Sequence, residues 1–401
     1  MKPTSSRDYR PVLGGTIALL SLAGLVAVFH FQGKDPSPPE PSPIPALQPP
    51  IELYFTQPGE PASPAEEGLV RAIDAARYTL EVASYNFNLW SVREALIRAQ
   101  RRGVDVRMVV DSDHLLEPEV AELLDVGIPV VGDRGEGLMH HKFVVIDGLD
   151  TWTGSMNLTY GSARLDHNNL LHIRSTPLAE DFGREFDEMF VDGRFGPASR
   201  ADTPHPRVEV NGTDLEVLFS PEDRVAARLV ALLRGAEQSI EVLAYSFTAD
   251  ALAEAMLARA HDGVAVRGVF DEGQATATGG EFSRLEQAGL DVRLDRSDGL
   301  LHHKLILIDG ETVITGSYNF TRSAEEQNDE AVLVLHDAAL ARQYLEEFER
   351  LFAAADLQGG SGLRQMLAGG VVDGAPRTPV SGEMSRTHIR PAAAVAAAQE
   401  D

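Results

Sequence analysis

The sequence predicts an α/β protein made of two similar halves, with one transmembrane helix ahead of them. An internal repeat with an offset of about 160 residues predicts the two halves. Short β-branched runs that alternate with amphipathic stretches predict an α/β sheet in each half, covered by helices on both faces. An uncharged apolar run near the N-terminus predicts the membrane helix. We therefore expect a duplicated α/β sandwich behind a membrane anchor.

The apolar run covers residues 12–31 and follows a segment that carries Lys2, Arg7 and Arg10. About 20 helical residues span the hydrocarbon core of a bilayer, and positive residues favour the cytoplasmic side. Residues 1–11 are therefore expected in the cytoplasm, with the body outside it. A cleaved signal peptide is the alternative, and it also places the body outside the cytoplasm.

The rest of the chain divides into a linker, two domains and a tail. Residues 32–50 are rich in Pro and Ser, which predicts an extended linker. The segment Leu80–Phe87 recurs as Ile240–Phe247. We place the first domain at residues 51–200 and the second at residues 201–355. A Gly- and Ala-rich tail, residues 356–401, is predicted to be largely disordered.

Local patterns assign elements within the first half. Amphipathic spacing predicts helices over Gly68–Arg77 and Ser91–Arg102, and apolar runs predict buried strands over Leu80–Ala83 and Val104–Val110. Later in each half an Asp-Gly pair stands between two apolar runs, which is a hairpin signal. These pairs are Asp147-Gly148 and Asp309-Gly310.

Charge and composition limit the functions that the chain could have. The net charge of −26 argues mildly against a nonspecific nuclease, because an acidic body is repelled by nucleic acid. It is equally repelled by anionic membrane surfaces. The absence of Cys excludes disulfides, thiolate catalysis and Cys-based zinc sites. Lys142 and Lys304 are the only lysines between residues 35 and 401, since the chain otherwise uses Arg.

One pattern of polar residues occurs once in each half. Residues two apart on a strand project to one face, so the His and Lys of each copy should point together, and the Ser and Asn of the next strand should share a face. The predicted hairpin would bring these pairs side by side. The members are His140, Lys142, Asp147, Ser155 and Asn157 in the first half, and His302, Lys304, Asp309, Ser317 and Asn319 in the second.

These side chains suit a phosphodiester. Ammonium, amide and hydroxyl groups hold and neutralise the nonbridging oxygens, and two imidazoles allow one to attack phosphorus while the other protonates the leaving oxygen. A single His-x-Lys arises by chance, and a His-His pair could belong to a core or a metal site. The recurrence at matched spacing, together with the scarcity of lysine, argues against both alternatives.

The doubled His-x-Lys-x4-Asp pattern with Gly-Ser-x-Asn resembles the phospholipase D superfamily over about residues 51–355. The resemblance implies two α/β-sandwich halves with the active site at their interface. It also implies a covalent phosphohistidine that water hydrolyses, with no metal and no other cofactor. It assigns catalysis to His140 and His302, phosphate binding to Lys142, Lys304, Asn157 and Asn319 with help from Ser155 and Ser317, and a supporting role to Asp147 and Asp309.

The halves differ at one position that supports the imidazole. In the superfamily an acidic residue downstream of Gly-Ser-x-Asn often orients the catalytic ring, and Glu330 fits that place after His302. The matching residue after His140 is Asn168, which cannot stabilise an imidazolium as a carboxylate can. Asp166 could substitute if the loop shifts. The sequence therefore suggests His302 as the nucleophile, although family precedent often gives that role to the first His.

The pattern defines the reaction more closely than the substrate. A membrane anchor and an acidic body outside the cytoplasm favour hydrolysis of phospholipid headgroup phosphodiesters. An endonuclease acting on DNA or RNA is the main alternative, and a phospholipid transferase like cardiolipin synthase or a non-enzymatic scaffold is less favoured. Because both half-sites lie in one chain, a monomer should suffice for activity.

Overall fold

The structure, a computed structural model, describes residues 50–59, 63–133, 135 and 137–368. The predicted membrane anchor, nearly all of the linker and the end of the tail lie outside these residues. No helix among the described residues is long and apolar enough to cross a membrane. The described residues fall within a single compact unit, Pro49–Asp401.

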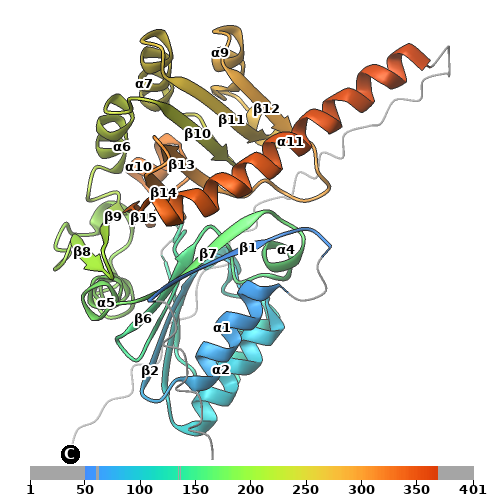
Figure 1. The fold of residues 1–401 in the computed structure, drawn as a ribbon. Coiled ribbons are helices and arrows are strands. Elements are labelled where there is room, and N and C mark those ends of the chain that lie inside the picture. Colours follow the sequence, from blue (N-terminus) through green and yellow to red (C-terminus); the bar gives the residue numbers. More distant parts are fainter. Residues whose placement is uncertain (1–49, 60–62, 134, 136, 369–401) are drawn as a thin grey trace, which may run out of the picture. The chain divides into compact units, whose positions relative to one another are not determined.

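Each half contains one mixed sheet (Figure 1). The first has the order β1-β7-β6-β5-β2-β3-β4, and the second repeats it as β9-β15-β14-β13-β10-β11-β12 with β8 added beside β9. In each sheet three strands run parallel and the remainder pair antiparallel. The matching strand orders confirm the predicted duplication of an α/β unit.

The first half contains β1 (Ile51–Thr56), α1 (Pro64–Ala75), β2 (Thr79–Ser84), α2 (Trp90–Arg102), β3 (Asp105–Val110), η1 (Ser112–His114), α3 (Pro118–Asp125), β4 (Val130–Gly132), β5 (Lys142–Ile146), β6 (Asp150–Gly154), α4 (Tyr160–Arg164), β7 (Asn168–Arg174) and α5 (Thr176–Phe190). A short η2 (Gly196–Ala198) leads towards the second half.

The second half contains β8 (Arg207–Val210), β9 (Thr213–Ser220), α6 (Val225–Arg234), β10 (Ser239–Ala244), α7 (Asp250–His261), β11 (Ala265–Asp271), α8 (Glu272–Ala275), α9 (Phe282–Gln287), β12 (Asp291–Asp295), β13 (Lys304–Ile308), β14 (Thr312–Gly316), α10 (Arg322–Glu326), β15 (Glu330–His336) and α11 (Ala338–Ala368). Helix α11 extends to Ala368, into the segment predicted as a tail, while residues 369–401 lie outside the described part.

The predicted helices and strands of the first half form as expected, because their apolar residues repeat with the right period. In α1 the side chains of Ala65, Leu69 and Ile73 are buried at intervals of four, which is one face of a helix. Helix α2 ends at Gly103, whose φ of 89° is the left-handed conformation that favours glycine at a helix terminus.

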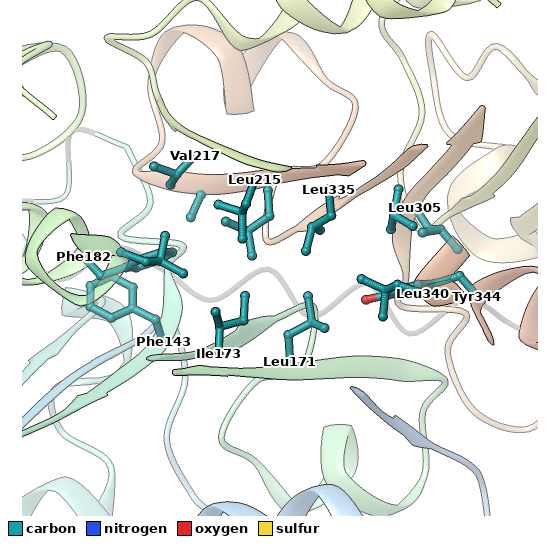
Figure 2. Packing of buried hydrophobic residues seen from close by; sticks show 14 of the residues in the cluster. Phe143, Leu171, Ile173, Phe182, Leu215, Val217, Leu305, Leu335, Leu340 and Tyr344 are labelled. Atoms are coloured by element: carbon teal, nitrogen blue, oxygen red, sulfur yellow. The ribbon is translucent and has the colours of Figure 1, made fainter. Parts of the chain in front are cut away.

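The alternation of side chains along β5 decides which residues reach the interface between the halves. Phe143 and Val145 belong to the apolar cluster between the two sheets, whereas Val144 and Ile146 belong to the cluster beneath the outer helices. Figure 2 shows the central cluster, where Phe143 and Leu171 of the first half face Leu215 and Leu335 of the second. Burial of each large apolar side chain here stabilises the fold by about 1.5–3 kcal/mol. The interface between the two halves is therefore part of the hydrophobic core.

Both predicted Asp-Gly hairpins form. Asp147 has a φ of 54° and Gly148 a φ of 59°, as a tight two-residue hairpin turn requires. The carboxylate of Asp147 accepts the backbone N–H groups of Tyr78 at 2.7 Å and Thr79 at 3.0 Å. Lys142 begins β5 and Asp147 follows its end, about 16 Å apart at the usual rise of a strand. The Asp of this motif therefore braces the hairpin against the start of β2.

Replacing Asp147 with Ala is expected to destabilise the fold by about 2–3 kcal/mol, because backbone donors lose a charged acceptor. Chemical denaturation would measure the loss. Asp147→Asn keeps an acceptor oxygen and tolerates the positive φ, so its loss should be clearly smaller. An unchanged unfolding midpoint for Asp147→Ala would contradict the bracing role.

Candidate active site

The two His-x-Lys segments begin in loops and are held by the opposite half of the molecule. The N–H of His140 donates to the carbonyl of Asp329 at 3.0 Å, and the N–H of His302 donates to the carbonyl of His167 at 2.9 Å. The residues Met139 and Asp329 form an isolated parallel bridge, as do His167 and Leu301. These reciprocal contacts bring both segments to the interface between the halves.

Each imidazole has its partner in the other half. Nδ1 of His140 lies 2.8 Å from Oε2 of Glu330, and Nδ1 of His302 lies 2.8 Å from Oδ1 of Asn168. The prediction that Glu330 stands behind His302 and Asn168 behind His140 is therefore wrong. The pairing is exchanged because β7 and β15 deliver these residues across the interface. The carboxylate argument that favoured His302 as nucleophile now favours His140.

Both serines are buried and engaged in positioning these partners. The hydroxyl of Ser155 donates to Oδ1 of Asn168 at 3.0 Å and accepts the N–H of Asn169 at 3.0 Å. The hydroxyl of Ser317 accepts the N–H of Ala331, beside Glu330, at 2.9 Å. Strands β6 and β14 end before these serines, so the expected strand geometry of the Ser and Asn residues does not hold. Their loops place the hydroxyls behind the imidazole partners.

The two asparagines of the motif keep a polar atom free. Asn157 and Asn319 are partly buried. Within the part of the chain that the structure describes, Oδ1 of each has no hydrogen-bond partner. A buried polar atom without a partner is unfavourable unless a ligand or water satisfies it. Both carboxamides are therefore available to a bound molecule.

The two lysines are buried at the start of β5 and β13. Nζ of Lys142 donates to the carbonyl of His140 at 2.7 Å, and Nζ of Lys304 donates to that of His302 at 2.8 Å. Neither ammonium forms an ion pair with a carboxylate among the described residues. Burial lowers the pKa of Lys142 to about 7. Burial, together with the positive charge of Lys142, lowers the pKa of Lys304 well below its ordinary value. An anion between the lysines would supply the missing countercharge.

Burial and the neighbouring lysines shift the pKa values of both histidines and of Glu330. Burial, followed by the two lysines, lowers the pKa of His140 and of His302 well below the ordinary range. Burial raises the pKa of Glu330 to about 7 against the opposing effect of Lys142. Since Glu330 and Asn168 accept from Nδ1, each neutral ring leaves the lone pair of Nε2 available. That is the state in which an imidazole can act as a nucleophile or base.

Two tyrosines line this site. The ring of Tyr85 lies 4.9 Å from that of His140, and the ring of Tyr245 lies 4.9 Å from that of His302. Each also faces the ammonium of the adjacent lysine, at 5.4 Å for Lys142 and 5.0 Å for Lys304. The tyrosines therefore restrict where each lysine and histidine can lie.

Two aspartates that sequence reasoning did not single out hold the histidine loops. Oδ2 of Asp111 accepts the N–H of Met139 at 3.0 Å, and Oδ2 of Asp271 accepts the N–H of Leu301 at 3.3 Å. An Asp occurs at the same place in both halves of the sequence, and this recurrence could have indicated a shared role for the two residues. His141, by contrast, points away from the site, and its Nε2 lies 3.0 Å from Oε1 of Glu185 in α5.

Among the described residues, no group of three or more His, Asp or Glu side chains is arranged to hold a metal ion. The groups at the interface are two imidazoles, two ammonium groups, the carboxamide of Asn168 and the carboxylate of Glu330, and the carboxamides of Asn157 and Asn319 follow two residues after the buried serines. Such a set can bind a phosphate ester and move protons to and from its oxygens.

Comparison with known proteins agrees with this chemistry. The family model "Cardiolipin synthase, PLD-like domain" matches residues 69–190 and 229–352. "Mitochondrial cardiolipin hydrolase" of Xenopus tropicalis is 38% identical over 134 residues, which cover 33% of this chain and 64% of that relative. The chain thus spans slightly less than two thirds of that relative's length. "Phospholipase D" of Rickettsia prowazekii is 33% identical over 140 residues, covering 35% of this chain and 68% of the relative.

A solved structure extends the likeness of fold across both halves. Phosphatidylserine synthase from Haemophilus influenzae superimposes with a TM-score of 0.58 at 13% identity, covering 76% of this chain and 86% of that one. At this identity the likeness concerns the fold alone. The two family matches, one in each half, and the doubled motif at their interface show that the chain belongs to the phospholipase D superfamily, with two PLD-like domains.

Proposed function

We propose that the protein is a phospholipase D-type phosphodiesterase that hydrolyses phospholipid headgroup esters through a phosphohistidine on His140. The observation that carries the proposal is the pair of buried lysines, neither of which forms an ion pair within the described part of the chain, beside two histidines with different partners. A phosphodiester anion would neutralise the ammonium groups, and the amide N–H groups of Asn157 and Asn319 would donate to its remaining oxygens.

In the first step Nε2 of His140 attacks phosphorus. A phosphorus–nitrogen bond forms while the bond to the leaving oxygen breaks. His302, which takes up a proton at Nε2 when the anionic phosphodiester binds beside it, donates that proton to the leaving oxygen. Positive charge develops on the attacking ring, where the carboxylate of Glu330 stabilises it through Nδ1. The amide of Asn168 orients His302 without adding a negative charge, which makes His302 the readier proton donor.

In the second step water replaces the histidine. Nε2 of His302 takes a proton from water, the water oxygen bonds to phosphorus, and the phosphorus–nitrogen bond breaks to restore neutral His140. The lysines hold the nonbridging oxygens throughout, which supplies the positive charge that the reaction needs at phosphorus. We propose that the chemistry proceeds without a metal.

Phospholipid is the substrate class that we favour. The names of two relatives, a cardiolipin hydrolase and a phospholipase D, support it, as does the net charge of −26, which disfavours a polyanionic nucleic acid. In this proposal residues 12–31 hold the chain at a membrane, with the body outside the cytoplasm. Both half-sites lie in one chain, so a monomer is the working unit.

The substrate is tested with the purified full chain in the presence of a metal chelator. Vesicles of phosphatidylcholine and of cardiolipin are offered in parallel with single-stranded DNA, and released headgroup, phosphatidic acid and DNA fragments are measured. We expect lipid hydrolysis at least tenfold above the rate of a His140→Ala control. Cleavage of DNA alone would replace the lipid proposal with the endonuclease alternative.

A further inference from the structure

Four large apolar side chains stand exposed around one side of the active site, and we call them the apolar rim. Trp90 is 54% exposed, Tyr160 48%, Leu165 48% and Leu300 42%. Three of them lie two or three residues from site residues: Tyr160 follows Asn157, Leu165 precedes Asn168, and Leu300 precedes His302. Single exposed apolar residues are common, but a group beside a site indicates binding.

Leu165 and Leu300 come from different halves and are fixed against each other. The N–H of Leu300 donates to the carboxylate of Asp166 at 3.1 Å, and the N–H of His167 donates to the carbonyl of Leu300 at 2.8 Å. At Gly299 a side chain would lie 1.7 Å from the carbonyl of Leu165, so the two backbones are in close contact. These two leucines therefore form one continuous patch at the junction of the halves.

Trp90 and Tyr160 are joined to this patch through a buried carboxylate. Glu66, 4% exposed, accepts from the hydroxyl of Ser91 at 2.6 Å and from Nε of Arg164 at 3.0 Å. The guanidinium of Arg164 in turn lies 5.4 Å from the centre of the Tyr160 ring. Trp90 stands next to Ser91, and Leu165 next to Arg164. The segments that carry the four side chains are thus held together through Glu66 and Arg164.

The second half shows that the fold does not require these residues. Its loop contacts are the same: the N–H of Leu138 donates to Oδ1 of Asn328 at 3.2 Å, and the N–H of Asp329 donates to the carbonyl of Leu138 at 2.9 Å. Yet Asp250, Arg322 and Gln327 occupy the positions that correspond to Trp90, Tyr160 and Leu165. Leu138 corresponds to Leu300, so three of the four rim positions are polar in the second half. The backbone of these loops therefore does not by itself require apolar side chains at those three positions.

We propose that the apolar rim docks on a lipid bilayer and presents a phospholipid headgroup to His140 and His302. This inference rests on the proposed lipid function and adds the surface that engages the substrate. Trp and Tyr are the residues that favour the interface between water and hydrocarbon. A zwitterionic bilayer suits a body of net charge −26, since it does not repel an acidic protein.

The length of chain ahead of the body permits this docking. The chain enters at Ile51, which pairs with Ile173 at the end of β7 remote from Asn168. The six residues of β1 rise about 20 Å towards the site. A Pro-rich segment such as residues 32–50 reaches roughly 60 Å when extended. Residues 12–31 and the rim can therefore meet the same membrane.

The fluorescence of Trp90 provides the test. The chain has two tryptophans, and Trp152→Phe removes the buried one, which leaves Trp90 as the sole reporter. The full chain is reconstituted into phosphatidylcholine vesicles, with or without phosphatidylcholine brominated on its acyl chains. We expect a blue-shifted emission and at least twofold quenching by the brominated lipid.

A matched pair of variants, each made in the Trp152→Phe background, isolates the rim. The double variant Tyr160→Arg with Leu165→Gln introduces the residues found at the corresponding positions of the second half. It should lose most of the quenching, and its rate of lipid hydrolysis should fall at least tenfold. Tyr78→Arg changes another exposed aromatic, at the opposite end of β2, and should change neither. An unchanged melting temperature, within a few degrees, shows that the variants fold.

Three results separate the possibilities. Quenching that persists in the rim variant, or is absent from the start, overturns the docking surface. Quenching of Trp90 by single-stranded DNA instead of by lipid also overturns it, in favour of base stacking. Rim-dependent quenching without any lipid hydrolysis supports the docking surface and rejects the proposed lipid activity.

Discussion

Replacing His302 with Ala is expected to trap the enzyme with its phosphoryl group on His140. With bis(p-nitrophenyl) phosphate the leaving phenolate needs no proton, so attack by His140 can proceed without His302. The second step needs His302 to activate water, and removing such a base slows it by about 10²–10⁴-fold. A stopped-flow measurement should therefore show a burst near one equivalent of p-nitrophenolate, followed by very slow turnover.

Two further variants test whether His140 is the nucleophile. His140→Ala lacks the nucleophile, so it should show no burst and a loss of about 10⁴-fold or more in turnover. Glu330→Gln retains the nucleophile but loses the charge behind it, so the rate of the burst should fall by about 10–100-fold. Mass spectrometry of the trapped His302→Ala enzyme should locate the modification on His140. A burst in His140→Ala, or a modified His302 in the wild type, would reverse the roles.

Replacing Lys142 with Met is expected to change activity and stability in opposite directions. Loss of one preorganised positive group at the phosphate should lower kcat/KM by about 10²–10³-fold. The fold, however, loses a buried ammonium without a carboxylate partner, and Met fills a similar volume without charge. The melting temperature of the unliganded protein should therefore rise by a few degrees.

The stability gain should depend on pH in a defined direction. Burial lowers the pKa of Lys142 from 10.5 in the unfolded chain to about 7 in the folded one. The folded state therefore resists protonation, and the native lysine destabilises the fold most at or below pH 7. The advantage of Lys142→Met should be largest there and fade as the pH approaches 10.5. Calorimetry across this range measures it.

Two outcomes would contradict the role given to Lys142. Near wild-type turnover in Lys142→Met would remove the lysine from phosphate binding. A lower melting temperature would show that the ammonium stabilises the empty site. Lys142→Arg is the control that keeps the charge, and we expect it to remain impaired, since a planar guanidinium does not fit a site built for a compact ammonium.

The sequence determined the features that depend on local geometry. The two-residue period of a strand placed His140 and Lys142 together and His141 away, because side chains alternate along any extended backbone. The Asp147-Gly148 pair specified its hairpin, since those residues readily take positive φ. Recurrence of the pattern with few lysines identified the residues that converge at the interface. The first two inferences concern residues within a few positions of one another, and the third compares two such local patterns.

Only the tertiary structure decided which histidine receives the carboxylate. Glu330 follows His302 along the chain yet lies 2.8 Å from His140, while Asn168 lies 2.8 Å from His302. The burial of Ser155 and the placement of the exposed leucines beside each other depend on the same packing. The contacts of the two histidines join residues more than a hundred positions apart, and their pairing follows from how the apolar inner faces of two sheets pack together. No local pattern carries that information, because the same strand periods fit either pairing.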